Sequence, residues 1–148
     1  MTEDPKPAET KDEKKEKPEL KDQLVVTQHS ITIGDRELHY TVTAGTIVLK
    51  DESDREKDYE GEKPRAQFFF VAYTLDGVED PASRPLTFSF NGGPGSSSVW
   101  LHLGLLGPRR VVMTEEGGLP KPPYQLTDNE FSLLDQTDLV FIDPVGTG

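Results

Sequence analysis

Cysteine is absent from the 148 residues, and histidine occurs only three times. Without cysteine the chain can form neither disulfides nor the thiolate sites that bind zinc or iron–sulfur clusters. His29, His39 and His102 do not have the spacing of a metal-binding motif. Neither a metal nor another cofactor is therefore expected.

Long apolar runs are also missing. No stretch approaches the ~20 consecutive apolar residues that a membrane-spanning helix needs. The first residues, MTEDPKPAETKDEKKEKPEL, contain no apolar core of a secretory signal. The default expectation is a cytoplasmic chain with no membrane anchor, although this argument does not exclude export of a fuller form.

Basic residues are outnumbered by acidic ones. The chain has 27 Asp and Glu against 16 Lys and Arg, for a formal net charge of −11 at pH 7. Nucleic acids and anionic membranes attract basic surfaces, so neither is expected as a partner. The composition says nothing about oligomeric state.

Residues 1–23 differ in composition from the rest of the chain. They hold eight acidic residues and six lysines, and their apolar residues are Met1, Ala8 and Leu20. Such a segment cannot bury enough surface to offset its ordering entropy, so a disordered charged tail is predicted. An arm that docks a partner is the alternative, but mixed charge runs are usually only solvated.

The remaining residues, 24–148, show strand patterns followed by a mixed pattern. Alternation over 31–49, interrupted by Gly34–Asp35 and Ala44–Gly45, predicts an antiparallel meander, and the charged residues 51–63 predict an exposed loop. The later elements suggest an α/β fold that has antiparallel first strands, then parallel strands with one buried helix, and that is incomplete. They are a strand covered on both faces at 66–75, a strand at 86–90, a helix buried on every side at 97–107, a short strand at 109–113 and a strand inside a parallel sheet at 137–145.

The stretch FNGGPGSSS, residues 90–98, lies between the strand at 86–90 and the predicted helix. Ligands bind at this position in α/β proteins, and a helix N-terminus attracts anions. A nucleotide-binding loop fits poorly, because neither G-x-G-x-x-G nor G-x-x-x-x-G-K-[ST] is present and Pro94 lacks an N–H. A purely structural turn is the second interpretation, since glycines at a strand end often serve only positive φ. The third is an oxyanion hole, for which α/β-hydrolases use an N–H of a loop at this position.

Together, NGGPGSSS and the later DLVFIDPVGTG resemble the serine carboxypeptidase family, and PLTFSFNGGPGSSSVWLHLGLLGPRRV resembles its bacterial branch. The resemblance implies a fragment of an α/β-hydrolase that acts on the C-terminus of a peptide or protein. It implies that the Gly93 N–H is an oxyanion-hole donor and that the Asn91 side chain and the Gly92 N–H bind the substrate's terminal carboxylate. Pro94 and Gly95 would support the loop.

The sequence departs from the family pattern at two positions of this region. The usual loop cysteine is replaced by Ser96, and a tryptophan often found two residues before the asparagine is replaced by Ser89. The second change puts substrate contact at that point in doubt.

A serine nucleophile on a sharp strand-to-helix turn requires G-x-S-x-G, and no such string occurs. Ser96, Ser97 and Ser98 are interpreted as capping and turn residues, with Ser97 or Ser98 as the helix N-cap. His102 is interpreted as a packing residue, and by resemblance Asp143 is structural. The family's nucleophile, aspartate and histidine come later, so the chain is interpreted as an N-terminal fragment. A non-catalytic module that binds peptide C-termini, or a fragment without function, are the alternatives.

The first prediction is that the chain alone does not hydrolyse blocked dipeptides, because it can position a substrate but has nothing to attack it. The measurement is turnover by the purified chain. Turnover that a serine-directed fluorophosphonate abolishes would contradict this interpretation.

Overall fold

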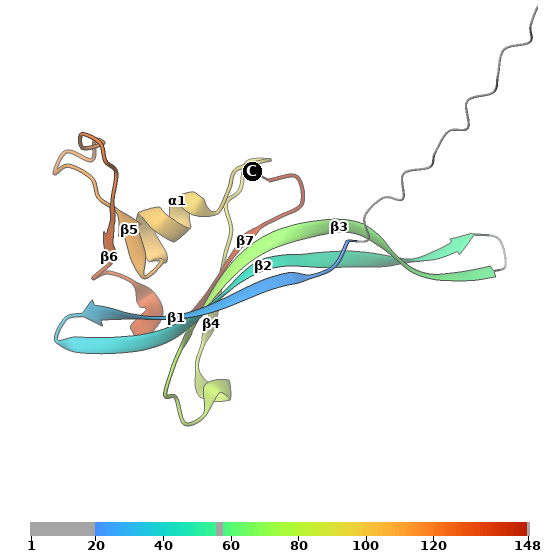
Figure 1. The fold of residues 1–148 in the computed structure, drawn as a ribbon, viewed down its shortest axis with the longest axis horizontal. Coiled ribbons are helices and arrows are strands. Elements are labelled where there is room, and N and C mark those ends of the chain that lie inside the picture. The colour runs from blue at the N-terminus through green and yellow to red at the C-terminus, as the bar shows by residue number, and fades with distance from the viewer. Residues whose placement is uncertain (1–19, 56–57, 148) are drawn as a thin grey trace, which may run out of the picture.

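The structure, a computed structural model, describes residues 20–55 and 58–147. Most of the predicted tail, residues 1–19, lies outside the described residues. The described strands form one sheet in the order β1-β2-β3-β7-β4 and a separate pair, β5-β6 (Figure 1). Their bounds are β1 Gln23–Ile33, β2 Arg36–Arg55, β3 Asp58–Leu75, β4 Leu86–Ser89, β5 Arg109–Val111, β6 Leu126–Asp128 and β7 Asp138–Asp143.

The first three strands form the predicted antiparallel meander. β1 and β2 meet at a two-residue turn of Gly34 and Asp35, where Gly34 has a φ of 60°. The second predicted interruption, Ala44–Gly45, is wrong, because both residues lie inside β2. A Cβ on Gly45 would lie 1.8 Å from the Gln23 carbonyl oxygen, so this glycine allows β1 to approach β2 closely. The sheet already begins at Gln23, the last residue of the predicted tail.

The exposed loop predicted at 51–63 is also wrong. β2 continues to Arg55 and β3 starts at Asp58, with register shifts at Leu49/Lys50 and Glu52/Asp54. Backbone hydrogen bonds do not depend on side-chain polarity, so a charged hairpin can extend into solvent. Ion pairs of Lys50 with Glu62 and of Arg65 with Asp51 connect its two strands.

The second half of the sheet is partly parallel. β7 pairs antiparallel with β3 and parallel with β4, so it lies inside the sheet. Parallel neighbours require a crossover, and the chain between β4 and β7 supplies it. This confirms the predicted fold class, an α/β fragment of a hydrolase-like sheet with antiparallel first strands followed by parallel ones.

The core lies on one face of the sheet, beneath the helical segment. Phe141 and Leu139 of β7, at most 1% exposed, form its centre together with Leu134. The predicted coverage of β3 on both faces is incomplete: Val71 and Tyr73 on the core face are buried, whereas Phe68 and Phe70 on the opposite face are only half-buried. The other buried members of the core are Ile31, Leu38 and Tyr40.

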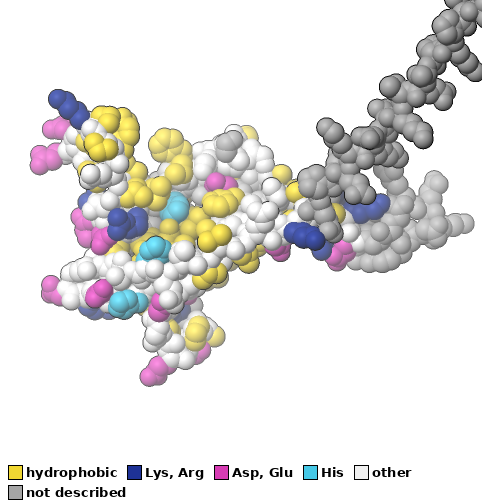
Figure 2. All heavy atoms as spheres, in the orientation of Figure 1, with side chains coloured by type: hydrophobic (Ala, Val, Ile, Leu, Met, Phe, Trp, Pro, Cys, Tyr) yellow, Lys and Arg dark blue, Asp and Glu magenta, His cyan; other side chains and the backbone are white. Residues whose placement is uncertain are grey.

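The predicted helix is shorter and less buried than expected. An α-helical turn, α1 (Val99–Leu101), continues as a π-helical segment, η2 (His102–Leu106), and ends at Gly107 as predicted. Leu101 and Leu106 pack against the core, but Trp100 is 68% exposed. Burial on every side is therefore wrong, because no described residue covers the outer face of this segment. Figure 2 shows apolar side chains at the surface in the region where Figure 1 labels α1.

A buried ion pair connects three strands. Arg84 Nε donates to Asp138 Oδ1 at 2.9 Å, and the two side chains are only 12% and 15% exposed. Asp138 Oδ1 also accepts the Leu75 N–H at 3.1 Å, and Arg84 Nη2 donates to the Leu134 carbonyl at 2.8 Å. The pair thereby connects the end of β3, the start of β7 and the segment just before β4.

Apolar side chains are exposed along the sheet edge that β4 forms. Leu86, Phe88 and Phe90 are 53–60% exposed. An edge strand with such side chains favours association with other chains. Among the described residues, no helix is long and apolar enough to cross a membrane.

The second prediction concerns the ion pair. Arg84→Ala should lower the free energy of unfolding by about 3–5 kcal/mol, because it leaves the buried Asp138 charge without its partner. The control is Arg110→Ala, since Arg110 pairs with Glu130 at the surface, where a pair contributes about 0–1 kcal/mol. Denaturant unfolding measures both values, and equal losses would contradict the assignment.

Candidate functional site

The glycine-rich loop lies where the two sequence motifs meet. β4 ends at Ser89, which is in register with Phe141 of its parallel neighbour β7. The carboxyl ends of parallel strands meet at one edge of the sheet, so the loop after β4 and the segment after β7 lie side by side. A Cβ on Gly95 would be 3.9 Å from the Gly146 carbonyl oxygen, which places the two turns near contact.

A tight turn determines the shape of the loop. Its Ser96 N–H donates to the Gly93 carbonyl at 3.2 Å. Pro94 occupies the second position of this turn and Gly95 the third, with a φ of 89°, which is the sequence pattern of a type II turn. Asn91 Nδ2 donates to Ser96 Oγ at 3.2 Å and so connects the start of the loop to its end.

Gly92 and Gly93 carry backbone N–H groups in the exposed part of the loop. Neither one donates to an acceptor in the described part of the chain. Both glycines are exposed, and Gly93 has a φ of 69°. Backbone amides that the fold leaves unpaired in a constrained loop can bind an anion.

The start of the helix already has an anionic partner within the protein. The Ser98 N–H donates to Asp143 Oδ1 at 2.6 Å, and Ser97 Oγ donates to the two carboxylate oxygens at 3.3 and 3.1 Å. Ser97 Oγ in turn accepts the Val99 N–H at 3.3 Å. Ser98 is the N-cap residue by position but makes no side-chain capping bond. The N-terminus of the helix is therefore occupied by a carboxylate of the protein itself.

These hydrogen bonds affect the ionisation of Asp143. Partial burial alone would raise the pKa of this carboxyl, but hydrogen bonds from Ser98 and Ser97 outweigh it and lower the pKa below its ordinary value. Asp143 therefore carries its negative charge over a wider acid range than a free aspartate does.

The other end of the helical segment is held by side chains that sequence reasoning missed. Asn129, 2% exposed, donates through Nδ2 to the carbonyls of Leu105 and Gly107, both at 2.8 Å. Ser132 Oγ donates to the Leu106 carbonyl at 2.9 Å. Asn and Ser in an irregular, Pro-rich region suggest turns, and nothing local in the sequence indicates that they cap a helix more than 20 residues earlier.

No described serine hydroxyl hydrogen-bonds to a histidine, so the described residues contain no serine–histidine pair for nucleophilic catalysis. His102 is a packing residue, as predicted: its ring stacks on Phe141 at 4.5 Å between centroids, and Nε2 is 2.5 Å from the Tyr73 hydroxyl. Burial lowers the pKa of His102 to about 4 and raises the pKa of Tyr73. Within the described ranges no cluster of three His, Asp or Glu side chains could hold a metal ion.

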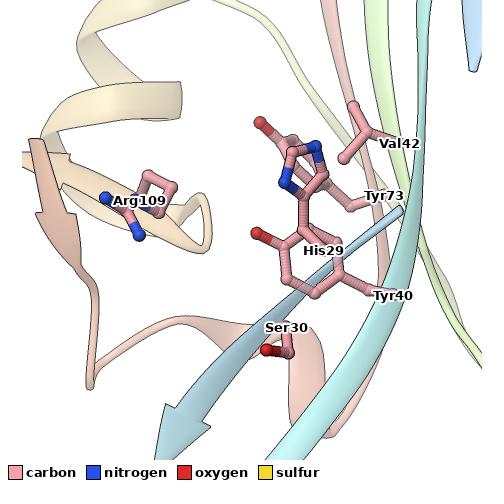
Figure 3. A pocket seen from close by; sticks show the side chains of 6 residues that line it. All are labelled: His29, Ser30, Tyr40, Val42, Tyr73 and Arg109. Carbon is pink, nitrogen blue, oxygen red and sulfur yellow. The ribbon is translucent and has the colours of Figure 1, made fainter. Parts of the chain in front are cut away.

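A separate hollow of about 430 Å³ lies between the meander and β5 (Figure 3). His29, Tyr40, Tyr73 and Arg109 line it, together with Ser30 and Val42, and none of these residues belongs to the glycine-rich loop. The guanidinium of Arg109, which lines the hollow, is paired with Asp128. The hollow is therefore separate from the loop, and its one cation is neutralised.

Comparison with known proteins agrees with the two motifs. The family model described as serine carboxypeptidase matches residues 54–148. The pheromone-processing carboxypeptidase KEX1 of Saccharomyces cerevisiae is 37% identical over 106 residues, which are 71% of this chain and 13% of that protein. Serine carboxypeptidase-like 33 of Arabidopsis thaliana is 37% identical over 89 residues, which are 59% of this chain and 16% of that protein. The chain thus spans only about a seventh of these relatives.

The third prediction is a pH dependence of stability from His102. Its folded pKa of about 4 lies below the ordinary 6.5, so the imidazole binds a proton more readily in the unfolded chain. The free energy of unfolding should therefore fall by up to about 3 kcal/mol as the pH falls from 6.5 to 4, and solvent contact with the ring makes this loss smaller. Above pH 6.5 His102 should not change the free energy of unfolding.

The measurement is the ring titration by NMR, together with unfolding curves of the wild type and of His102→Phe. The variant should lack this part of the pH dependence. A ring that titrates near 6.5 in the folded protein would contradict the packing role.

Proposed function

This chain belongs to the serine carboxypeptidase family, and we propose that its loop from Asn91 to Gly95 provides the substrate-carboxylate and oxyanion donors of such an enzyme. We place residues 24–148 in the N-terminal portion of an α/β-hydrolase domain. The substrate class is a peptide or protein with a free C-terminus. Hydrolysis of its last peptide bond is the activity of the whole enzyme.

The single observation that carries this proposal is the pair of unpaired amides at Gly92 and Gly93. They follow each other in an exposed loop at the carboxyl end of β4, and a turn closed by Ser96 limits the motion of that loop. An amide that meets its ligand without reorganisation stabilises developing charge far better than a mobile one does.

Two adjacent donors can serve two different anions of one substrate. A C-terminal residue carries its carboxylate one residue away from the carbonyl that is attacked. We assign the Gly93 N–H to the oxyanion of that carbonyl and the Gly92 N–H to the carboxylate. The Asn91 amide has two N–H bonds, and since one is directed to Ser96 Oγ, the other remains for the carboxylate.

The chemistry is acyl transfer. A serine oxygen adds to the scissile carbonyl as its proton passes to a base, and the carbonyl electrons move onto the carbonyl oxygen. The carbonyl then re-forms as the C–N bond breaks, and the leaving amine takes the proton from the base. Water repeats the addition on the acyl-enzyme and releases the shortened peptide. A donor such as the Gly93 N–H lowers the first barrier by ~3 kcal/mol. The nucleophile and its base are not assigned to residues of this chain.

The fourth prediction tests the carboxylate site directly. An acetylated dipeptide with a free C-terminus should bind the 148-residue chain saturably and shift the amide resonances of Gly92 and Gly93, whereas its C-terminal amide should not. Asn91→Ala should weaken binding of the free acid about tenfold or more, because a hydrogen bond to a charged group contributes about 1.5–3 kcal/mol.

The control variant is Gln125→Ala, which removes an exposed side-chain amide outside the loop. It should leave the affinity unchanged. Equal binding of acid and amide, or an affinity that Asn91→Ala does not change, would remove the assignment. Saturable binding to the wild type also separates a functional pocket from a fragment without function.

A further inference from the structure

Asp143 is the residue through which the two motifs touch by hydrogen bonds. It is the last residue of β7 and is in register with Phe69 of β3, so its backbone belongs to the interior of the sheet. Its carboxylate accepts the Ser98 N–H at 2.6 Å and the Ser97 hydroxyl. A rigid strand therefore holds the point at which the glycine-rich loop enters the helix.

We propose that Asp143 is the positioning residue of the loop: it fixes the exit of the loop at Ser97 and Ser98 and thereby orients the Gly92 and Gly93 N–H groups. This inference rests on the proposed function of the loop. Asp143 does not touch the substrate in this account, and it acts only through the two serines.

The loop is held at one end by β4 and at the other by this contact. β4 pairs with β7 up to Ser89, and the carboxylate of the same strand holds Ser97 and Ser98. The same strand, β7, therefore holds both ends of the intervening loop. Within the loop the described contacts are the Gly93–Ser96 turn and the Asn91–Ser96 bond. Neither of these connects the loop to the sheet, so release of Ser98 would free the turn as a unit.

The carboxylate is chemically suited to this position because it only accepts hydrogen bonds. Ser97 Oγ therefore donates to Asp143 and keeps a lone pair for the Val99 N–H. An asparagine of the same shape could still accept from Ser98 through its oxygen. Its NH₂ group would face one of the donors, and the charge would be lost.

The segment after Asp143 also approaches the loop. The Thr147 N–H donates to the Pro144 carbonyl at 3.0 Å, and Gly146 has a φ of 81° within this turn. The Gly146 carbonyl is the nearest heavy atom to a Cβ built on Gly95. Asp143 therefore sets the distance between two turns that lie almost in contact.

The fifth prediction compares Asp143→Ala with Asp143→Asn in the 148-residue chain. The alanine variant should speed amide exchange at Ser98 about tenfold or more and should increase the mobility of the Gly92 and Gly93 amides in ¹⁵N relaxation. It should weaken binding of the free-acid dipeptide about tenfold. The asparagine variant should show smaller changes in the same direction.

The matched control is Ser132→Ala, which removes a hydrogen bond at the other end of the same helical segment. It should lower the unfolding free energy while leaving the loop amides and the dipeptide affinity unchanged. If Asp143→Ala changes only the unfolding free energy, as Ser132→Ala does, the positioning role is wrong. If the wild type binds no dipeptide, the proposed function fails, and the mobility of the loop amides still decides the role of Asp143.

Discussion

The contact between the Asp143 carboxylate and the start of the helix connects the interior of the sheet to the glycine-rich loop. It is a charge-assisted hydrogen bond of 2.6 Å, and such bonds are roughly twice as strong as neutral ones. On one side of it lies β7, an interior strand that pairs with both β3 and β4. On the other side lie the glycine-rich loop and the helical segment. The candidate site therefore takes its geometry from an interior strand and not from the loop itself.

The helical segment is stabilised from outside at both of its ends. Asp143 accepts the donors at its start, and Asn129 and Ser132 satisfy the carbonyls at its end. A single α-helical turn that changes to π-helical hydrogen bonding has little stability of its own. Its position is therefore a property of the tertiary structure. The face that packs on the core does so through Leu101 and Leu106, and the opposite face stays exposed.

The site combines rigid support with unpaired donors. Its Pro94–Gly95 turn restricts the backbone, while the amides of Gly92 and Gly93 have no acceptor in the described protein. Unpaired amides in an exposed loop are inexpensive because water can solvate them until a ligand arrives. An oxyanion site requires donors that are held in place before the ligand arrives, and this requirement supports the role proposed for the loop.

The sequence by itself determined the strands and the family. Apolar alternation over 31–49 located the end of β1 and most of β2. Short apolar runs located β3, β4 and β7. The strings NGGPGSSS and DPVGTG identified the serine carboxypeptidase family, and Gly93, Gly95 and Gly146 within them have the positive φ values that favour glycine. Sequence patterns gave wrong predictions where tertiary contacts determine the local structure. Gly45 suggested a turn, but it allows a close contact between two strands. The charged residues 51–63 suggested a loop, but they continue the hairpin of β2 and β3.

Only the tertiary structure decided which groups meet. Asp143 and Ser98 are 45 residues apart, Arg84 and Asp138 are 54 apart, and Asn129 lies 22 residues beyond Gly107. No local pattern encodes such pairs. The first two depend on the strand order β3-β7-β4, and the third depends on the pairing of β5 with β6. The same order decided that the helix terminus is occupied by a carboxylate of the protein, and that the loop amides remain available. The sequence was sufficient to identify the glycine-rich loop. The packing of the sheet against the helical segment determined the position of the Gly92 and Gly93 N–H groups.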